Sequence, residues 1–404
     1  MPAQSETRFI IILGLLIGLS PFAVDMYLPS LPAIGADLGA SPELVQQTLS
    51  VYLACFALPQ LFFGPLSDAV GRRVTLLLGL ILFMAGALLC VASRDIGELI
   101  LARGLQGIGA AAVLVTVPAL VRDRFAGDEF ARMMGFIMLV MAVAPLVAPL
   151  VGGLVLVLSG WRSIFLVLAG LGLIGLVLFM RYLGETLPPE RRESLRPGRL
   201  LANYGSLLKH RPSLSFMLCG GFGFAGMMAF LTASPFVYID LYGISAQAYG
   251  LLFALNILTM MVFTTVSNRF VRQAGAHRIL GIGMLVLLAA SIVMCLLAAW
   301  GEPSLAVLVA SIMLFVGTNG MVSANTMALV MNSFGHISGS ASAMAGFLRF
   351  GIGALAGVLV GVLHDGTIRP LLVTMIGCGV LALLFYGIGS IRGAGSAAGP
   401  QMET

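Results

Sequence analysis

The sequence predicts an all-α integral membrane protein with twelve transmembrane helices arranged in two pseudo-symmetric six-helix halves. Of its 404 residues, 59% are hydrophobic and only 10% are charged, whereas roughly a quarter of a typical soluble domain is charged. The apolar residues also occur in runs of about 20, which is the length that crosses a bilayer. This composition excludes a soluble enzyme, a disordered chain and a collagen-like chain.

Twelve apolar runs can be counted, six on each side of one long polar stretch. We expect the spans at 8–30, 44–66, 74–93, 98–121, 133–158, 162–182, 213–237, 247–270, 279–300, 304–330, 338–363 and 370–390. The middle of the polar stretch is expected to form a short surface helix. The predicted organisation is an amino-terminal half at 1–183, a central cytoplasmic loop at 184–212, a carboxy-terminal half at 213–391 and a cytoplasmic tail at 392–404.

The basic residues predict which side of the membrane each loop faces. Seventeen of the 22 Lys and Arg residues lie on the side that holds both termini and the central loop, and three lie on the other side. Cytoplasmic loops carry such an excess. We therefore expect both termini in the cytoplasm, and basic clusters that face anionic membrane lipid and bind no nucleic acid.

A repeat offset supports two related halves. Gly71 follows the second span and Gly275 follows the eighth, 204 positions later, and the same offset relates Gly153 to Gly357. Halves of this kind enclose a site near the midplane and rock about it, which is the physical basis of alternating access.

Asp25 and Arg103 are the charged residues that we expect to couple transport to protons. Asp25 is the acidic residue inside a predicted span, where a carboxylate must pair, face water or carry a proton. Arg103 is its expected partner, because both residues fall in the outer halves of their spans. The alternatives are an interfacial Asp25 that caps backbone beside Pro29, and an Arg103 that bonds helix carbonyls.

Several motifs carry a resemblance to a known family. The stretch Gly64-x-Leu66-x-Asp68-x-x-Gly71-Arg72-Arg73 resembles the signature loop of the major facilitator superfamily. Two more resemble its proton-driven and exporter motifs, namely Leu101-x-Arg103-x-x-Gln106-Gly107-x-Gly109 and Pro145…Pro149-x-x-Gly152-Gly153. More narrowly, four stretches resemble the Bcr/CflA drug-resistance family: 25–32, 185–192, 235–239 and 349–354.

The resemblance implies a major facilitator fold and a proton-coupled drug efflux transporter (a drug:H+ antiporter) of the bacterial inner membrane. The implied partners are protons and small drugs of the bicyclomycin type, and the implied result is antibiotic resistance. It also implies that Asp25 carries the proton. The alternative is a proton-coupled importer, or a metabolite exporter (for example of an amino acid), of the same fold. We expect a monomer with no enzymatic activity, no cofactor and no metal, because the four histidines are scattered over separate loops.

A drug pocket needs adaptable apolar walls with a few hydrogen-bonding groups. The candidate substrate-binding residues are Tyr27, Tyr52, Phe56, Gln60, Gln106, Met138, Met141, Phe230, Ser234, Asn256, Asn319 and Arg349. For a single Met or Phe, core packing or contact with lipid is the favoured alternative, and for the asparagines it is bonding between helices. For Arg349, binding of a polar drug and bonding to helix carbonyls are equally weighted.

A third group of residues is expected to hold or release conformational states. These residues are Gly64, Asp68, Gly71, Arg72, Arg73, Asp123, Pro149, Gly152 and Gly153. The arginines and Asp68 are expected to pair with Asp123, and the glycines and prolines allow helices to approach closely and to bend. The carboxy-half copy of the signature loop has Arg272 in place of Asp68, so it is not expected to form the same lock.

Overall fold

The computed structural model describes residues 3–192, 194–301 and 303–397. Over these ranges the chain forms helices joined by short turns, with no strand. Twelve helical segments in the described ranges are long and apolar enough to cross a membrane. The predicted fold class and number of spans are therefore confirmed.

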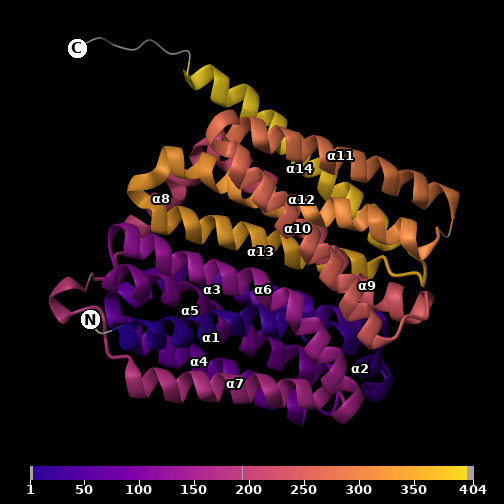
Figure 1. The fold of residues 1–404 in the computed structure, drawn as a ribbon, viewed down its shortest axis with the longest axis horizontal. Coiled ribbons are helices and arrows are strands. Elements are labelled where there is room, and N and C mark those ends of the chain that lie inside the picture. The colour runs from indigo at the N-terminus through magenta and orange to yellow at the C-terminus, as the bar shows by residue number, and fades with distance from the viewer. Residues whose placement is uncertain (1–2, 193, 302, 398–404) are drawn as a thin grey trace. The chain divides into compact units, whose positions relative to one another are not determined.

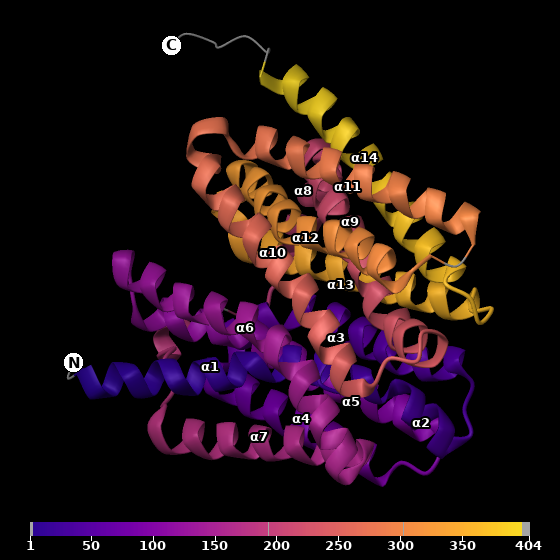
Figure 2. The same cartoon turned by 45° about the vertical axis from the view of Figure 1, so that its right-hand side comes forward.

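The chain divides into two compact units, and each is described by itself. Unit 1 comprises Met1–Leu195, Leu231–Ile257 and Gly357–Thr367. Its helices are α1 (Ala3–Asp25), η1 (Leu28–Ser30), α2 (Leu31–Leu38), α3 (Pro42–Val70), α4 (Arg72–Ala92), α5 (Ile96–Arg124), α6 (Gly127–Ser159), α7 (Trp161–Tyr182) and η2 (Pro189–Arg191). Within it, α5 packs against α3 and α4, while α1 packs against α6 and α7, as Figures 1 and 2 show.

Unit 2 comprises Arg196–Phe230, Leu258–Ala356 and Ile368–Thr404. It contains α8 (Pro197–Lys209), α11 (Ala276–Trp300), α12 (Leu305–Phe334), η4 (Gly335–Ile337), α14 (Arg369–Ala397) and most of α9 (Arg211–Pro235), α10 (Ala246–Ala274) and α13 (Ser338–Val362). The remaining ends of α9, α10 and α13 belong to unit 1, together with the π-helical segment η3 (Phe236–Leu241).

Helix α8 is the surface helix predicted within the central loop. It buries Tyr204 and Leu207 while Leu201 is 70% exposed. It is also held by Asn203, whose Nδ2 donates to Ser340 Oγ of α13 at 3.3 Å. One apolar face therefore packs onto unit 2 and leaves the other face accessible.

The first span is broken, although the apolar pattern predicts a continuous helix over 8–30. Helix α1 ends at Asp25, and the chain restarts through η1 and α2. Pro29 and Pro32 are the second residues of these two segments. A proline is tolerated in the first turn of a helix, where its missing N–H has no partner anyway, but it disrupts the interior of a continuous helix. Helix breaks at membrane depth occur where backbone is buried in protein or lines a cavity. Asp25 therefore lies at a helix end rather than on a helix face.

Gly71 and Gly275 have the same local structure, as the repeat offset predicts. Their φ angles are +106° and +81°, and they directly precede α4 and α11. Such backbone conformations strongly favour glycine. At Gly71 a side chain would in addition collide with the Glu185 carboxylate.

We predict that Gly71→Ala lowers the free energy of unfolding by about 1–3 kcal/mol, the usual cost of a non-glycine residue in such a backbone conformation. The measurement is thermal unfolding of the purified protein in detergent. Gly135→Ala is the control, because Gly135 lies in α6 and a Cβ there meets no neighbouring atom. Equal unfolding temperatures for the two variants would contradict this account of Gly71.

Candidate functional site

Arg103 is enclosed by aromatic rings inside unit 1. Its guanidinium carbon lies 4.3 Å from the ring centroids of both Tyr27 and Tyr52, and 5.7 Å from that of Phe165. Its Nη1 donates to Gln106 Oε1 at 2.5 Å. The residue is 0% exposed, and Nε and Nη2 have no hydrogen-bond partner within the described chain. Stacking on two rings stabilises a desolvated cation.

The glycines around Arg103 explain why helix α5 can carry it there. A Cβ at Gly107 would meet the backbone carbonyl of Tyr52 in α3, and one at Gly109 would meet the backbone of Phe83 in α4. On the opposite side of that contact, Gly86 of α4 packs against the backbone of Gln106. Small residues of this kind let membrane helices approach closely, so the motif brings α5, which carries Arg103, into close contact with α3 and α4.

Asp25 does not form the direct link to Arg103 that we predicted. The carboxyl is 4% exposed at the end of α1, and no cation of the described chain lies within ion-pair distance of it. Tyr52 is instead within electrostatic reach of both Asp25 and Arg103, and Tyr249 is within reach of Asp25. Of these two tyrosines, Tyr52 is the one that also packs on Arg103.

Helix α6 packs against the break that follows Asp25. A Cβ at Gly152 would collide with the backbone carbonyl of Met26, and one at Gly153 would meet the carbonyl of Ala246 at the start of α10 at 2.9 Å. Pro149 is buried one turn earlier. The exporter-type motif of α6 therefore contacts the segment that directly follows Asp25. The spacing of these residues in the sequence does not predict this contact.

Within the described part of unit 1, the predicted pairing with Asp123 is made by Arg72, whereas no ion pair joins Arg73 to Asp123, and Asp68 pairs with Arg72 instead. Arg72 Nε donates to Asp123 Oδ2 at 2.9 Å, and its Nη1 lies 2.5 Å from Asp68 Oδ1 and 3.2 Å from Ser67 Oγ. One arginine therefore joins the end of α3, the start of α4 and the end of α5. Gly64 lies one turn before this cluster, facing Val115 of α5 at ordinary contact distance.

Glu185 completes this cluster, and sequence reasoning did not assign it a role. Its carboxylate accepts hydrogen bonds from the backbone N–H groups of Arg72 at 3.0 Å and Arg73 at 3.2 Å. Thr186 Oγ1 donates to Asp123 at 3.0 Å. Glu185 therefore caps α4 in place of Gly71, which has no side chain. The sequence signals are an acidic residue three positions after the sixth span and the family-like stretch 185–192 that begins with it.

The other pocket candidates in unit 1 are divided between packing and polar contacts. Phe56 stacks on Tyr52 at a centroid distance of 6.0 Å, and Gln60 Nε2 donates to the Phe56 carbonyl at 3.0 Å. Ser234 is hydrogen-bonded to Tyr249 at 3.0 Å. Asn256 Nδ2 donates to its own helix at the Leu252 carbonyl, leaving a buried Oδ1 without a partner in the described chain. Phe56 and Tyr52 therefore join the arginine site directly.

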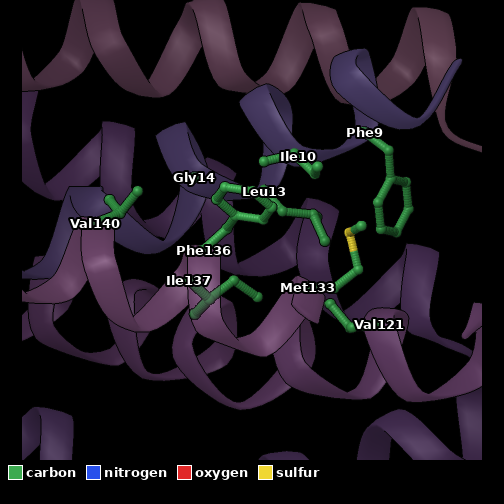
Figure 3. Close-up of a pocket in the computed structure, with 9 residues that line it drawn as sticks. All are labelled: Phe9, Ile10, Leu13, Gly14, Val121, Met133, Phe136, Ile137 and Val140. Atoms are coloured by element: carbon green, nitrogen blue, oxygen red, sulfur yellow. The ribbon is translucent and has the colours of Figure 1, made fainter. Parts of the chain in front are cut away.

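The methionine candidates do not form a common wall with this site. Met138 is 55% exposed and Met141 is partly exposed, both on α6. A separate apolar crevice lies between α1, the end of α5 and α6, where the side chains face one another in Figure 3. Its lining is Phe9, Ile10, Leu13, Gly14, Val121, Met133, Phe136, Ile137 and Val140.

Unit 2 holds the remaining candidates. Phe230 is fully buried. Asn319 Nδ2 contacts Met227 Sδ at 3.1 Å, and Asn325 Nδ2 donates to Ser267 Oγ of α10 at 2.9 Å, which is the expected bonding between helices. Arg349 stacks on Phe224. Within the described residues, no group of three His, Cys, Asp or Glu side chains is placed to hold a metal ion.

Comparison with known proteins identifies similar sequences over nearly the whole chain. A family model described as Major Facilitator Superfamily matches residues 13–358. The chain is 37% identical to a bicyclomycin resistance protein homolog of Haemophilus influenzae, covering 95% of this chain and 96% of that protein. It is 30% identical to a chloramphenicol resistance protein of Pseudomonas aeruginosa, with 92% and 89% covered.

Solved structures share the fold at lower identity. A peptide transporter crystallised with sulfate gives a TM-score of 0.75 at 15% identity, covering 96% of this chain and 94% of that one. A bacterial homolog of the human lysosomal transporter Spinster gives 0.74 at 14% identity, covering 97% and 98%. These likenesses concern the fold alone.

We predict that Glu185→Ala lowers the free energy of unfolding by about 1–2 kcal/mol, because the first turn of α4 loses both its cap and a favourable charge. Thermal unfolding in detergent is the measurement. Glu190→Ala is the matched control, since Glu190 is an exposed carboxylate of the same loop and should change stability by less than about 0.5 kcal/mol. A Glu185 variant as stable as the control would refute the capping role.

Proposed function

Because the chain belongs to the Major Facilitator Superfamily, a family of transporters, we propose that it is a drug efflux transporter of the bacterial inner membrane driven by proton entry. The twelve apolar helices make it a multi-pass membrane protein. Relatives named for bicyclomycin and chloramphenicol resistance support small drugs as cargo. The excess of basic residues on one side supports cytoplasmic termini, and a monomer contains all the residues that the mechanism uses.

The observation that carries the proposal is the buried carboxyl of Asp25 at a break in a membrane helix. Burying a charged carboxylate without a cation is costly. The described chain offers Asp25 no ion-pair partner. Asp25 is therefore the group proposed to bind a proton in this arrangement and to release it when its surroundings become wet.

The coupling is proposed to run through Tyr52 to Arg103. Arg103 cannot release a proton itself, and it is held by two rings and one amide. A change of charge at Asp25 alters the field at Tyr52, and with it the packing of the ring against Arg103. Drug and proton then compete for one arrangement of α1, α3 and α5.

The proton gradient supplies enough free energy for resistance. One charge that moves through 100 mV is worth about 2.3 kcal/mol, which corresponds to roughly a fiftyfold concentration ratio of drug. The cluster at Arg72 is proposed to hold α3, α4 and α5 together as one body. The contact of Gly153 in α6 with Ala246 at the start of α10 is proposed to differ between the two access states, because it joins helices of the two six-helix halves.

We predict that Asp25→Asn abolishes gradient-driven transport, because an amide does not exchange protons with the gradient. Radiolabelled chloramphenicol or bicyclomycin uptake is measured in proteoliposomes with an acidic lumen, a polarity that favours antiport. The wild type should accumulate drug and the variant should fall by at least about tenfold, while drug-for-drug exchange persists.

Asp365→Asn is the control, since Asp365 is an exposed loop carboxylate and its loss should change transport less than twofold. Full accumulation by Asp25→Asn would remove Asp25 from the mechanism. Accumulation by the wild type only with the opposite gradient polarity would favour the importer.

A separate prediction concerns Arg103→Lys, which keeps the charge but loses the planar stack between two rings. If stacking contributes about 2 kcal/mol at a desolvated site, the initial rate of gradient-driven transport should fall roughly thirtyfold. Arg162→Lys is the matched control, because Arg162 also stacks on a ring, that of Trp161 at 4.2 Å, but its side chain is 39% exposed. Equal effects of the two substitutions would show that enclosure of Arg103 is unimportant.

A further inference from the structure

Arg349 is a cation without an acidic residue in its surroundings. It lies in α13, within unit 2. Among the described residues of that unit there is no Asp or Glu. A charge within a membrane protein normally pairs, faces water or marks a substrate pathway. Unit 2 therefore supplies Arg349 with no carboxylate from a spanning helix.

The contacts of Arg349 leave part of its guanidinium accessible. The guanidinium carbon lies 4.1 Å from the ring centroid of Phe224 and 5.9 Å from that of Phe350, and the two rings meet edge to face at 5.0 Å. Its Nε is buried, with no hydrogen-bond partner in the described chain. No carbonyl of the described residues accepts a hydrogen bond from it, so the alternative of carbonyl bonding is not supported. The residue as a whole is only partly buried.

The surrounding helices hold this arrangement in place. A Cβ at Gly353 would meet the side chains of Met228 and Phe224, so α13 and α9 approach closely one turn after Arg349. This close approach of the helices keeps the Phe224 ring in contact with Arg349. Gly351, two residues after Arg349 in α13, has open space where a Cβ would stand. A rigid aromatic base below an accessible guanidinium edge is thus built into α9 and α13.

Arg349 differs from Arg103 in the way that matters for binding. Both guanidinium groups lie against aromatic rings, three for Arg103 and two for Arg349, but Arg103 is 0% exposed and donates to Gln106. Arg349 has no such internal acceptor in the described chain and keeps an accessible edge. Arginine presents a fork of N–H donors that matches the two oxygens of a carboxylate. The guanidinium of Arg103 is therefore enclosed within unit 1, whereas that of Arg349 in unit 2 is available to bind a ligand.

We infer that Arg349, with Phe224 and Phe350, forms a subsite for the carboxylate of aromatic substrates. The carboxylate accepts hydrogen bonds from the open edge of the guanidinium, and the substrate ring packs beside Phe350, which is partly exposed, while the buried Phe224 supports the guanidinium from the other side. This inference rests on the proposed drug transport, because it adds aromatic carboxylates to the uncharged drugs proposed as cargo of the same protein.

The test is equilibrium binding of two probes, pyrenebutyrate and its uncharged amide, to the purified full-length protein in detergent. Binding is measured by the fluorescence of the probe. The wild type should bind the carboxylate about tenfold more tightly than the amide. Arg349→Gln should remove that preference and leave amide binding within twofold. Arg349→Lys should retain part of the preference, since it keeps the charge without the fork. Arg278→Gln, at an exposed arginine of α11, should behave as the wild type.

Equal binding of the two probes by the wild type overturns the inference. So does an Arg349→Gln protein that loses both probes alike, or a lysine variant that retains its unfolding temperature but shows no preference. Since the readout is binding, it separates this inference from the transport proposal. A protein that prefers the carboxylate but moves no drug under a gradient contradicts only the proposed function.

Discussion

The enclosure of Arg103 is the interaction on which the site in unit 1 depends. A membrane helix offers no water to a buried cation, so the protein must supply the stabilising groups itself. Two tyrosine rings and the Gln106 amide do so, from the break after α1, from α3 and from α5. That geometry requires α3 and α5 to be in near backbone contact, which only a residue as small as Gly107 permits. The burial of Arg103 therefore depends on the glycine pattern of α5.

The break in the first span must also be covered by protein. Ending α1 at Asp25 places a carboxyl beside irregular backbone, and such backbone at membrane depth needs protein around it. Helix α6 supplies that cover through Gly152, which lies against the Met26 carbonyl. The carboxyl, the break and the glycine pair therefore form one structural element, in which movement of α6 changes the surroundings of Asp25 directly.

At the other end of these helices, unit 1 is held by charges rather than rings. Arg72 joins α3, α4 and α5 through Asp68 and Asp123, while the chain after α7 returns to cap α4 with Glu185. Polar clusters near helix ends hydrate easily when helices separate. Unit 1 therefore combines the fully buried aromatic site around Arg103 with the ion-pair cluster around Arg72. The two sites differ in their exposure to water.

The sequence by itself determined the twelve spans, the surface helix and the identity of the buried charges, because the free energy of placing Asp25, Arg103 or Arg349 in hydrocarbon depends on local composition. It also predicted the contact of Arg72 with Asp123, since complementary charges stand at adjoining helix ends. Only the tertiary structure decided that Arg103 packs on tyrosines instead of pairing with Asp25, that α1 breaks, and that Glu185 caps α4. Those outcomes depend on the rotation and approach of helices far apart in the chain, which no local pattern records.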